Sequence, residues 1–317
     1  MNHVSRWLKV VGLNVVLIGM FLFSVFMMDT DPAMADQSSV VKAENAFFRG
    51  SHMLSRDNIS EALPALEEAV RLDPGVEKYR RVLAIAYNNQ GIKLAKEGKP
   101  LEGLRSMEKA ISIEPKDSEL KGNFVSAVLQ SVAGKSEKLK IEDRIYFVQK
   151  ILEFEPENAS AKKAMAAFLN NQGINQAQGV VSPSEIDSLN AALEMDPSNQ
   201  KIKKNLSMVY YNLALQKGKE LAFDEQIELL RKAESYSSKD PVIRDSLGRA
   251  ISNLAVLKGK QGKFDEQIAL MKESSELLPN DALIRKNLAA AYNNQALNSP
   301  ELKTQDSISI LENSLKI

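Results

Sequence analysis

Apolar residues repeat along this chain at an interval of 41 residues. One apolar column follows that interval through six repeats: Leu83, Phe124, Met165, Leu206, Leu247 and Leu288. Two further columns lie three residues apart, which is helical spacing: Leu63, Leu104, Ile145, Ile186, Ile227 and Ile268, and Leu66, Met107, Val148, Leu189, Leu230 and Met271. Five prolines keep the same interval or twice it: Pro74, Pro115, Pro156, Pro197 and Pro279. The pattern predicts a helical repeat protein.

Each repeat is predicted to hold two helices. In the second repeat, Leu83 and Tyr87 lie on one stripe of a first helix, and the Glu97-Gly98-Lys99 stretch ends it. Leu104 and Met107 then lie on the inner side of a second helix. A helical pair of this size cannot bury its own apolar stripe, whereas stacked pairs can. We therefore expect an all-α fold, an α-solenoid of about seven helix-turn-helix repeats over residues 36–317. The repeats end near Pro74, Pro115, Pro156, Pro197, Ser238, Pro279 and Ile317.

The first 35 residues read as a targeting segment. Arg6 and Lys9 precede an apolar run from Val10 to Met28, and Ala33-Met34-Ala35 resembles a signal-peptide cleavage pattern. A retained membrane anchor is the alternative, because a run of this length can span the hydrocarbon layer. In that case the membrane is contacted only through residues 10–28. Both interpretations place the repeats outside the cytoplasm, in the periplasm or cell envelope.

Composition removes several function classes. The chain has 41 basic and 41 acidic residues, so no net charge favours nucleic acid. It has no cysteine and two histidines, which leaves no disulfide framework, no thiol catalysis and no His-rich or Cys-rich metal site. We expect no cofactor and no metal, and nothing in the sequence indicates an enzyme.

The repeats resemble the tetratricopeptide family. The second repeat carries Tyr87-Asn88-Asn89-Gln90-Gly91 followed by Ala110 and Pro115. Further matches fall in the first and fourth repeats: Gly50, Ala62, Leu66, Ala69 and Pro74, then Gly173, Ala192 and Pro197. The resemblance implies paired helices with the first helix of each pair on a concave face, and a scaffold that binds proteins. A solenoid of HEAT-like repeats, with a similar scaffold role, is the alternative fold.

Two features depart from that family. The interval is 41 residues rather than 34. The small residue expected in the second helix is present as Ala62 and Gly103 and is then replaced by larger side chains: Arg144, Glu185, Gln226 and Gln267. The replacement calls into question the close approach of the paired helices in the later repeats.

A polar column, which we call the amide column, is the main candidate binding site. It consists of Asn89, Gln130, Asn171, Asn212, Asn253 and Asn294. Two residues earlier lie mostly apolar side chains, so the amides point away from the apolar stripe. A primary amide both donates and accepts, and can therefore pair with a peptide unit whatever its side chain. The alternative is that these amides bond within or between helices.

A basic column is the weaker candidate: Arg80, Lys121, Lys162, Lys203, Arg244 and Arg285. It could attract acidic ligands, but we expect instead that it pairs with acids that end the preceding second helices, namely Asp73, Glu114, Glu155 and Asp196. His52 has no neighbouring ligands, and the paired acids Glu67-Glu68 and Asp224-Glu225 are typical of solvated helix faces.

The expected function is an exported scaffold that binds a protein or peptide of unknown identity through a concave groove, with no role for nucleic acid. A self-associating structural module of an envelope assembly is the alternative. It is motivated by Leu311, Leu315 and Ile317, which end the last predicted helix without a polar cap.

Overall fold

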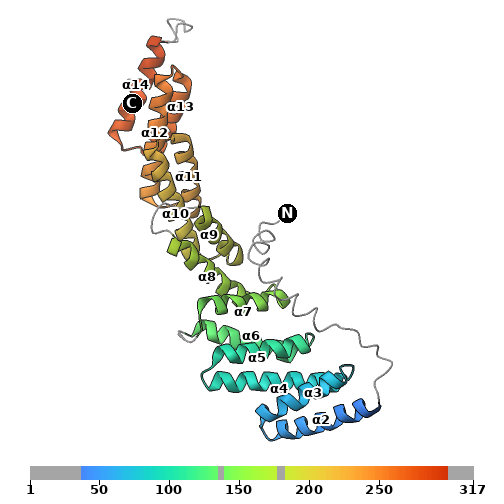
Figure 1. Ribbon diagram of the computed structural model, residues 1–317. Coiled ribbons are helices and arrows are strands. Elements are labelled where there is room, and N and C mark those ends of the chain that lie inside the picture. Colours follow the sequence, from blue (N-terminus) through green and yellow to red (C-terminus); the bar gives the residue numbers. More distant parts are fainter. Residues whose placement is uncertain (1–36, 135–138, 177–182, 299–317) are drawn as a thin grey trace. The chain divides into compact units, whose positions relative to one another are not determined.

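The computed structural model describes residues 37–134, 139–176 and 183–298. These residues form thirteen helices, α2 to α14, and no strand (Figure 1). The first helices of the repeats are α2 (Gln37–Ser55), α4 (Glu77–Lys96), α6 (Ser118–Ala133), α8 (Ala159–Gln176), α10 (Gln200–Lys219), α12 (Pro241–Lys260) and α14 (Ala282–Asn298). The second helices are α3 (Ile59–Leu72), α5 (Pro100–Ile113), α7 (Ile141–Phe154), α9 (Pro183–Met195), α11 (Phe223–Tyr236) and α13 (Phe264–Leu277). The all-α solenoid predicted from the sequence is confirmed.

The chain divides into two compact units, residues 1–165 (unit 1) and 166–317 (unit 2), with the division inside α8. Within unit 1, α2 to α5 stack as neighbouring antiparallel helices, and within unit 2 the same stacking runs through α10 to α13 (Figure 1). None of the helices in the described ranges is long and apolar enough to cross a membrane. The predicted targeting segment and Leu311, Leu315 and Ile317 lie outside the described residues.

The predicted apolar columns form the core of both units. Every member of the column that begins at Leu83 is buried, as is every member of the column that begins at Leu66. In the column that begins at Leu63, Ile145 and Ile186 are only half-buried. Aromatic rings fill the space in unit 1, where Phe124 packs edge-on against Phe147. The 41-residue interval therefore repeats one packing layer, with the same side-chain positions buried each time.

Capping residues define where most first helices begin. Asp117 accepts hydrogen bonds from the backbone N–H groups of Glu119 and Leu120, at 2.9 and 3.1 Å. The same position, 41 residues apart each time, caps the following first helices: Asn158, Asn199, Asp240 and Asp281. These side chains satisfy N–H groups that a helix start leaves without a partner. The second repeat has Val76 here, which has no such side chain.

Tight turns separate the helices of several pairs. Gly98 and Gly262 have φ angles of 78° and 76°, and the equivalent Asp57 and Leu221 have 59° and 58°. Glycine enters this left-handed region without steric cost, whereas a leucine does not. The predicted end of the first helix at Glu97 agrees with α4, which ends at Lys96.

The close approach of paired helices persists, but the small residue changes sides. In unit 1, a Cβ built on Gly91 would lie 2.6 Å from the carbonyl oxygen of Gly103, so the two backbones touch. In unit 2, Gly259 of α12 lies beneath the side chain of Gln267 in α13, and a Cβ there would lie 2.5 Å from its Cδ. Gly218 and Gln226 repeat the arrangement one repeat earlier. Gln226 and Gln267 therefore pack over glycines, and in these two repeats the close approach of the paired helices is retained.

Candidate functional site

The amide column lies on the exposed side of the first helices. Asn171, Asn212, Asn253 and Asn294 are all exposed on successive first helices of unit 2. In unit 1, Gln130 is exposed and Asn89 is half-buried. The sequence predicted that these amides would point away from the apolar stripe, and their positions agree with that geometry.

A structural hydrogen bond is made in the neighbouring column, one residue earlier. Asn170 is 3% exposed, and its Oδ1 accepts a hydrogen bond of 2.7 Å from Asn205 of the next first helix. Asn88 and Ser252 occupy the same column and are also buried. Asn171 itself is within 3.5 Å of the Asn170 amide. Asn170 therefore makes an inter-helix hydrogen bond, whereas the amides of the amide column in unit 2 are exposed.

Exposed apolar residues flank the amide column on the same helix face. Ile85 and Met208 lie four residues before an amide, and three more lie three residues after one: Leu215, Val256 and Leu297. Residues at these spacings share one face of a helix. In the first repeat the amide position is itself taken by Phe48, which is 58% exposed. Sequence analysis missed this flank, although the same interval would have located it.

The basic column binds partners other than those expected. Arg80 donates to the Pro74 carbonyl oxygen at 2.6 Å, and its Nε lies 3.5 Å from Glu114, the acid that closes its own repeat. Lys162 pairs with Glu157 at 2.6 Å rather than with Glu155.

Lys121 lies 5.3 Å from the centre of the Phe154 ring, and Arg285 donates to the Pro279 carbonyl oxygen at 3.2 Å. Lys203 and Arg244 belong to the same column, in which Lys203 is half-buried and Arg244 is exposed. Arg80, Lys121, Lys162 and Arg285 therefore contact groups other than the acids that end the preceding second helices.

Two tyrosines bridge helices in unit 1 through carboxylates 41 residues apart. The Tyr87 hydroxyl donates to Glu67, and the Tyr146 hydroxyl donates to Glu108. Burial, followed by the hydrogen bond to Glu108, raises the pKa of Tyr146 to about 12. The Arg105 guanidinium stacks 4.5 Å from the centre of the same ring. Glu67, one of the paired acids, therefore has a packing role.

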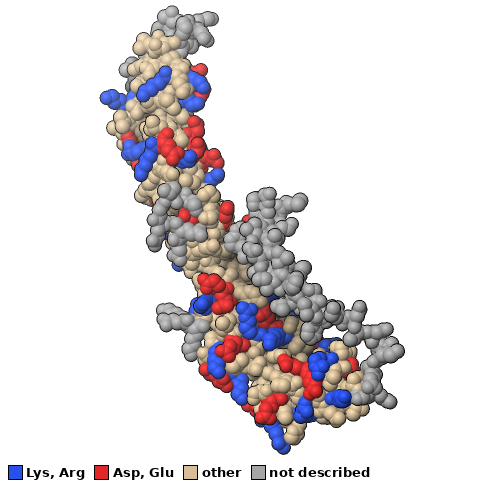
Figure 2. Space-filling model, viewed as in Figure 1, with Lys and Arg blue, Asp and Glu red and all other residues tan. Residues whose placement is uncertain are grey.

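Opposite charges are intermixed over the surface. Figure 2 shows blue and red side chains alternating on the visible face of each unit. Lys217–Glu225 and Lys258–Glu266 form equivalent ion pairs, of 3.0 and 2.8 Å, in successive repeats. Within the described ranges no group of His, Asp and Glu side chains is arranged to hold a metal ion.

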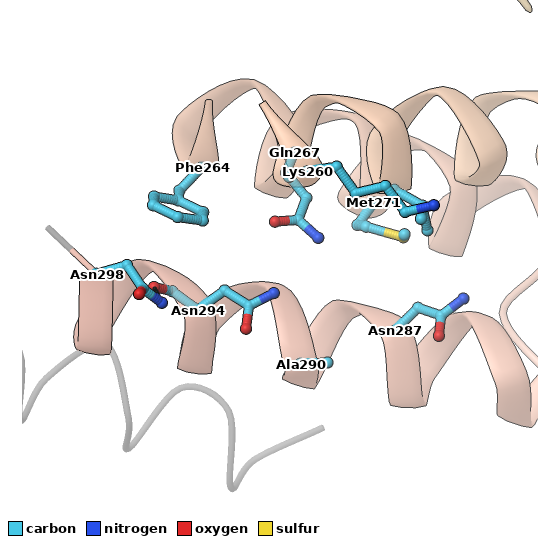
Figure 3. A pocket seen from close by; sticks show the side chains of 10 residues that line it. Lys260, Phe264, Gln267, Met271, Asn287, Ala290, Asn294 and Asn298 are labelled. Carbon is cyan, nitrogen blue, oxygen red and sulfur yellow. Dashed lines mark hydrogen bonds between the residues drawn. The ribbon is translucent and has the colours of Figure 1, made fainter. Parts of the chain in front are cut away.

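A cleft opens in unit 2 between α12, α13 and α14. It is open to solvent, and its volume is about 450 Å³. Figure 3 shows Gln267 and Met271 of α13 facing Asn287, Ala290 and Asn294 of α14 across it. Its remaining lining comes from Val256, Gly259, Lys260, Phe264 and Asn298. The cleft therefore joins one member of the amide column to an apolar wall.

Comparisons with known proteins find matches among solved structures. No protein-family model and no curated protein matches the sequence. Among solved structures, a tetratricopeptide repeat protein from Parabacteroides merdae is 13% identical, covers 86% of this chain and 99% of its own, and has a TM-score of 0.25.

Two further solved structures give similar values. A thermophilic tetratricopeptide repeat protein of Thermus thermophilus is 16% identical, over 66% of this chain and 98% of its own, with a TM-score of 0.22. MamA from Desulfovibrio magneticus is 17% identical, over 63% and 97%, with a TM-score of 0.23. At this level of similarity the function of the chain has to be inferred from its own residues.

Proposed function

We propose that the chain is a protein-interaction scaffold that binds an extended polypeptide segment along the first helices of unit 2. The observation that carries this proposal is the exposed amide column with its apolar flank. Primary amides offer a donor and an acceptor to a peptide unit, and the flanking apolar residues offer contacts to its side chains. Catalytic chemistry has no comparable support among the described residues.

The usual spacing of packed helices is compatible with an extended ligand. Packed helices lie about 8–10 Å apart, and an extended chain advances about 3.3 Å per residue, so each amide would meet roughly every third peptide unit. The four amides of unit 2 would then engage a segment of about nine residues. Affinity would then come from backbone groups with little sequence preference, because every peptide unit offers the same N–H and C=O.

The test replaces Asn171, Asn212 and Asn253 together with alanine. The probe is a set of peptides selected from a displayed random twelve-residue library on the purified chain. Each lost hydrogen bond removes about 0.5–1.5 kcal/mol, so the triple variant should bind the selected peptides more than tenfold more weakly. Its melting temperature should stay unchanged, since these side chains are exposed.

Asn170→Ala is the matched control. It removes the buried bond to Asn205 and should lower the melting temperature while peptide affinity is retained. Unchanged affinity in the triple variant, together with a lower melting temperature, would show that the amide column is structural and would reject the proposal.

We further propose that the scaffold acts outside the cytoplasm, in the periplasm or cell envelope. The support is the sequence of residues 1–35, with its basic start, apolar run and Ala33-Met34-Ala35. Mass spectrometry of the protein from its own cells should find an N-terminus after Ala35. A retained Met1 would indicate an anchor, and a protein found only in the cytoplasmic fraction would contradict export.

Self-association is the second candidate, and apolar exposure on α14 favours it. Leu297 and Leu283 of this helix are 78% and 58% exposed. Exposed apolar residues on a helix of a repeat array are available to a second copy of the chain. Light scattering at micromolar concentration should then detect a dimer or larger species, and Leu283→Ser with Leu297→Ser should restore a monomer. A strict monomer of the unmodified chain rejects this candidate.

A further inference from the structure

The sequence Phe-Asp-Glu-Gln-Ile occurs twice, at residues 223–227 and 264–268. In both copies the glutamine side chain packs over a glycine of the preceding first helix, Gly218 or Gly259. In the second copy, Phe264 and Gln267 also line the cleft between α12, α13 and α14. The repeated segment therefore contributes to a possible binding surface as well as to packing.

Gln267 has an unmet hydrogen bond at the cleft. The side chain is 5% exposed, and its Oε1 is buried without a donor. Figure 3 shows its amide directed into the space opposite Asn294. A buried acceptor without a partner is costly, so a ligand that brings an N–H group here would gain by satisfying it. Gln226 has the same buried Oε1 without a donor one repeat earlier.

The walls of the cleft are apolar beside that acceptor. Val256, Phe264 and Met271 stand around Gln267, and Lys260 adds a positive charge to the lining. A peptide residue with an apolar side chain matches this arrangement, because its backbone N–H can donate to the acceptor while its side chain packs against the apolar wall. A saccharide matches it poorly, because hydroxyl groups around its ring would lie unpaired against Val256 and Met271.

We propose that the cleft is a specificity pocket for an apolar side chain of the bound peptide, with Gln267 Oε1 accepting the backbone N–H of that residue. This inference rests on the proposed function and adds a sequence preference to it. The equivalent Phe223 and Gln226 form a second position, with Asn253 as the corresponding amide. Because successive helices lie about 8–10 Å apart, the favoured peptide carries two apolar residues roughly three positions apart.

The first test reads the sequences of the selected peptides. The full chain is purified and challenged with the random twelve-residue library, and with a peptide of residues 299–317 and neutral oligosaccharides as separate probes. We expect the selected peptides to share two apolar residues three positions apart. Selected peptides with no apolar preference overturn the proposal. Tighter binding of the 299–317 peptide or of an oligosaccharide than of any selected peptide also overturns it.

The second test isolates the acceptor. Gln267→Met keeps the side-chain volume over Gly259 and removes the oxygen, and it should weaken binding of a selected peptide roughly fivefold. Gln267→Glu keeps an acceptor and should retain affinity. A buried glutamate is already present at the equivalent position two repeats earlier, where Glu185 lies. Equal affinity of the Met variant and the unmodified chain overturns the role of Gln267.

Photo-crosslinking provides a readout that needs no variant to fold. A benzophenone amino acid replaces the first apolar residue of a selected peptide, and mass spectrometry then locates the crosslink. We expect it at residues 256–271, and crosslinks confined to other helices overturn the proposal. If the triple amide variant loses binding while Gln267→Met does not, the scaffold function stands and the specificity pocket fails. If neither variant loses binding, both fail.

Discussion

At the scale of single residues, the close contact between paired helices is made in two ways, and the two contacts should differ in how well they tolerate an alanine in place of the glycine. Gly91 faces the backbone of Gly103, whereas Gly259 faces the flexible end of Gln267. Gly91→Ala should therefore destabilise unit 1 by about 1–3 kcal/mol, because backbone has to move. Gly259→Ala should cost much less, since Gln267 can turn aside and alanine favours the helix by up to ~1 kcal/mol. Urea unfolding followed by circular dichroism measures both, and equal losses would contradict this account.

The tyrosine that bridges α5 and α7 should make stability depend on alkaline pH. Burial and the bond to Glu108 raise the pKa of Tyr146 to about 12, above the value near 10 of an unfolded tyrosine. A raised pKa means that the stabilisation is complete below pH 10 and is lost as the pH rises towards 12. Absorbance titration at alkaline pH should show several late-titrating phenols, because the pKa values of Tyr79, Tyr87 and Tyr236 are also raised, and Tyr146→Phe should remove one of them. A normal titration of all tyrosines would contradict the buried bond.

At the scale of elements, the missing cap of α4 can be supplied. Val76 has φ −78° and ψ 105°, close to the −74° and 113° of the capping residue Asp117. Threonine has the shape of valine, so Val76→Thr keeps the contact with the unit 1 core and adds an acceptor for the helix start. It should stabilise unit 1 by about 0.5–1 kcal/mol in urea unfolding. Asp117→Ala should lose about 1 kcal/mol, and no change in either variant would refute the capping argument.

Much of this architecture could be predicted from the sequence, because the interval repeats every packing layer. The columns that begin at Leu83 and Leu66 correctly predicted buried core positions, and the polarity of the amide column correctly predicted that most of its side chains are exposed. Side-chain partners could not be predicted in the same way. The partners of Arg80 are Glu114 and the Pro74 carbonyl oxygen. Which groups lie within reach of a long side chain depends on the loop conformation, and the 41-residue interval does not predict that conformation. From the sequence, Gln267 replaces the small residue of the tetratricopeptide pattern. Its packing over Gly259 could not be predicted, because the two residues meet only in the folded structure.

At the scale of the whole molecule, two compact units share a chain with equal numbers of opposite charges. The extensive helix contacts join elements that are neighbours or next neighbours in sequence, as in α3–α4, α4–α5 and α4–α6. Stability in such an array is close to a sum of local terms, and a local change spreads only to adjacent repeats. The amide column of unit 2 can therefore be altered without loss of unit 1, which is what the binding experiments require.

Hydrogen exchange tests this independence directly. Gly91→Ala should speed exchange in α4 and α5 and in the adjacent α3 and α6, while α12 and α13 keep their protection. Ser274→Ala is the reciprocal variant, because it removes a buried hydrogen bond of 2.7 Å from α13 to the Gly248 carbonyl oxygen of α12. It should speed exchange in α12 and α13 and leave α4 and α5 unchanged. If either variant speeds exchange across all described helices, the chain unfolds as one cooperative body. A loss of peptide binding in unit 2 variants would then require proof that the whole chain is still folded.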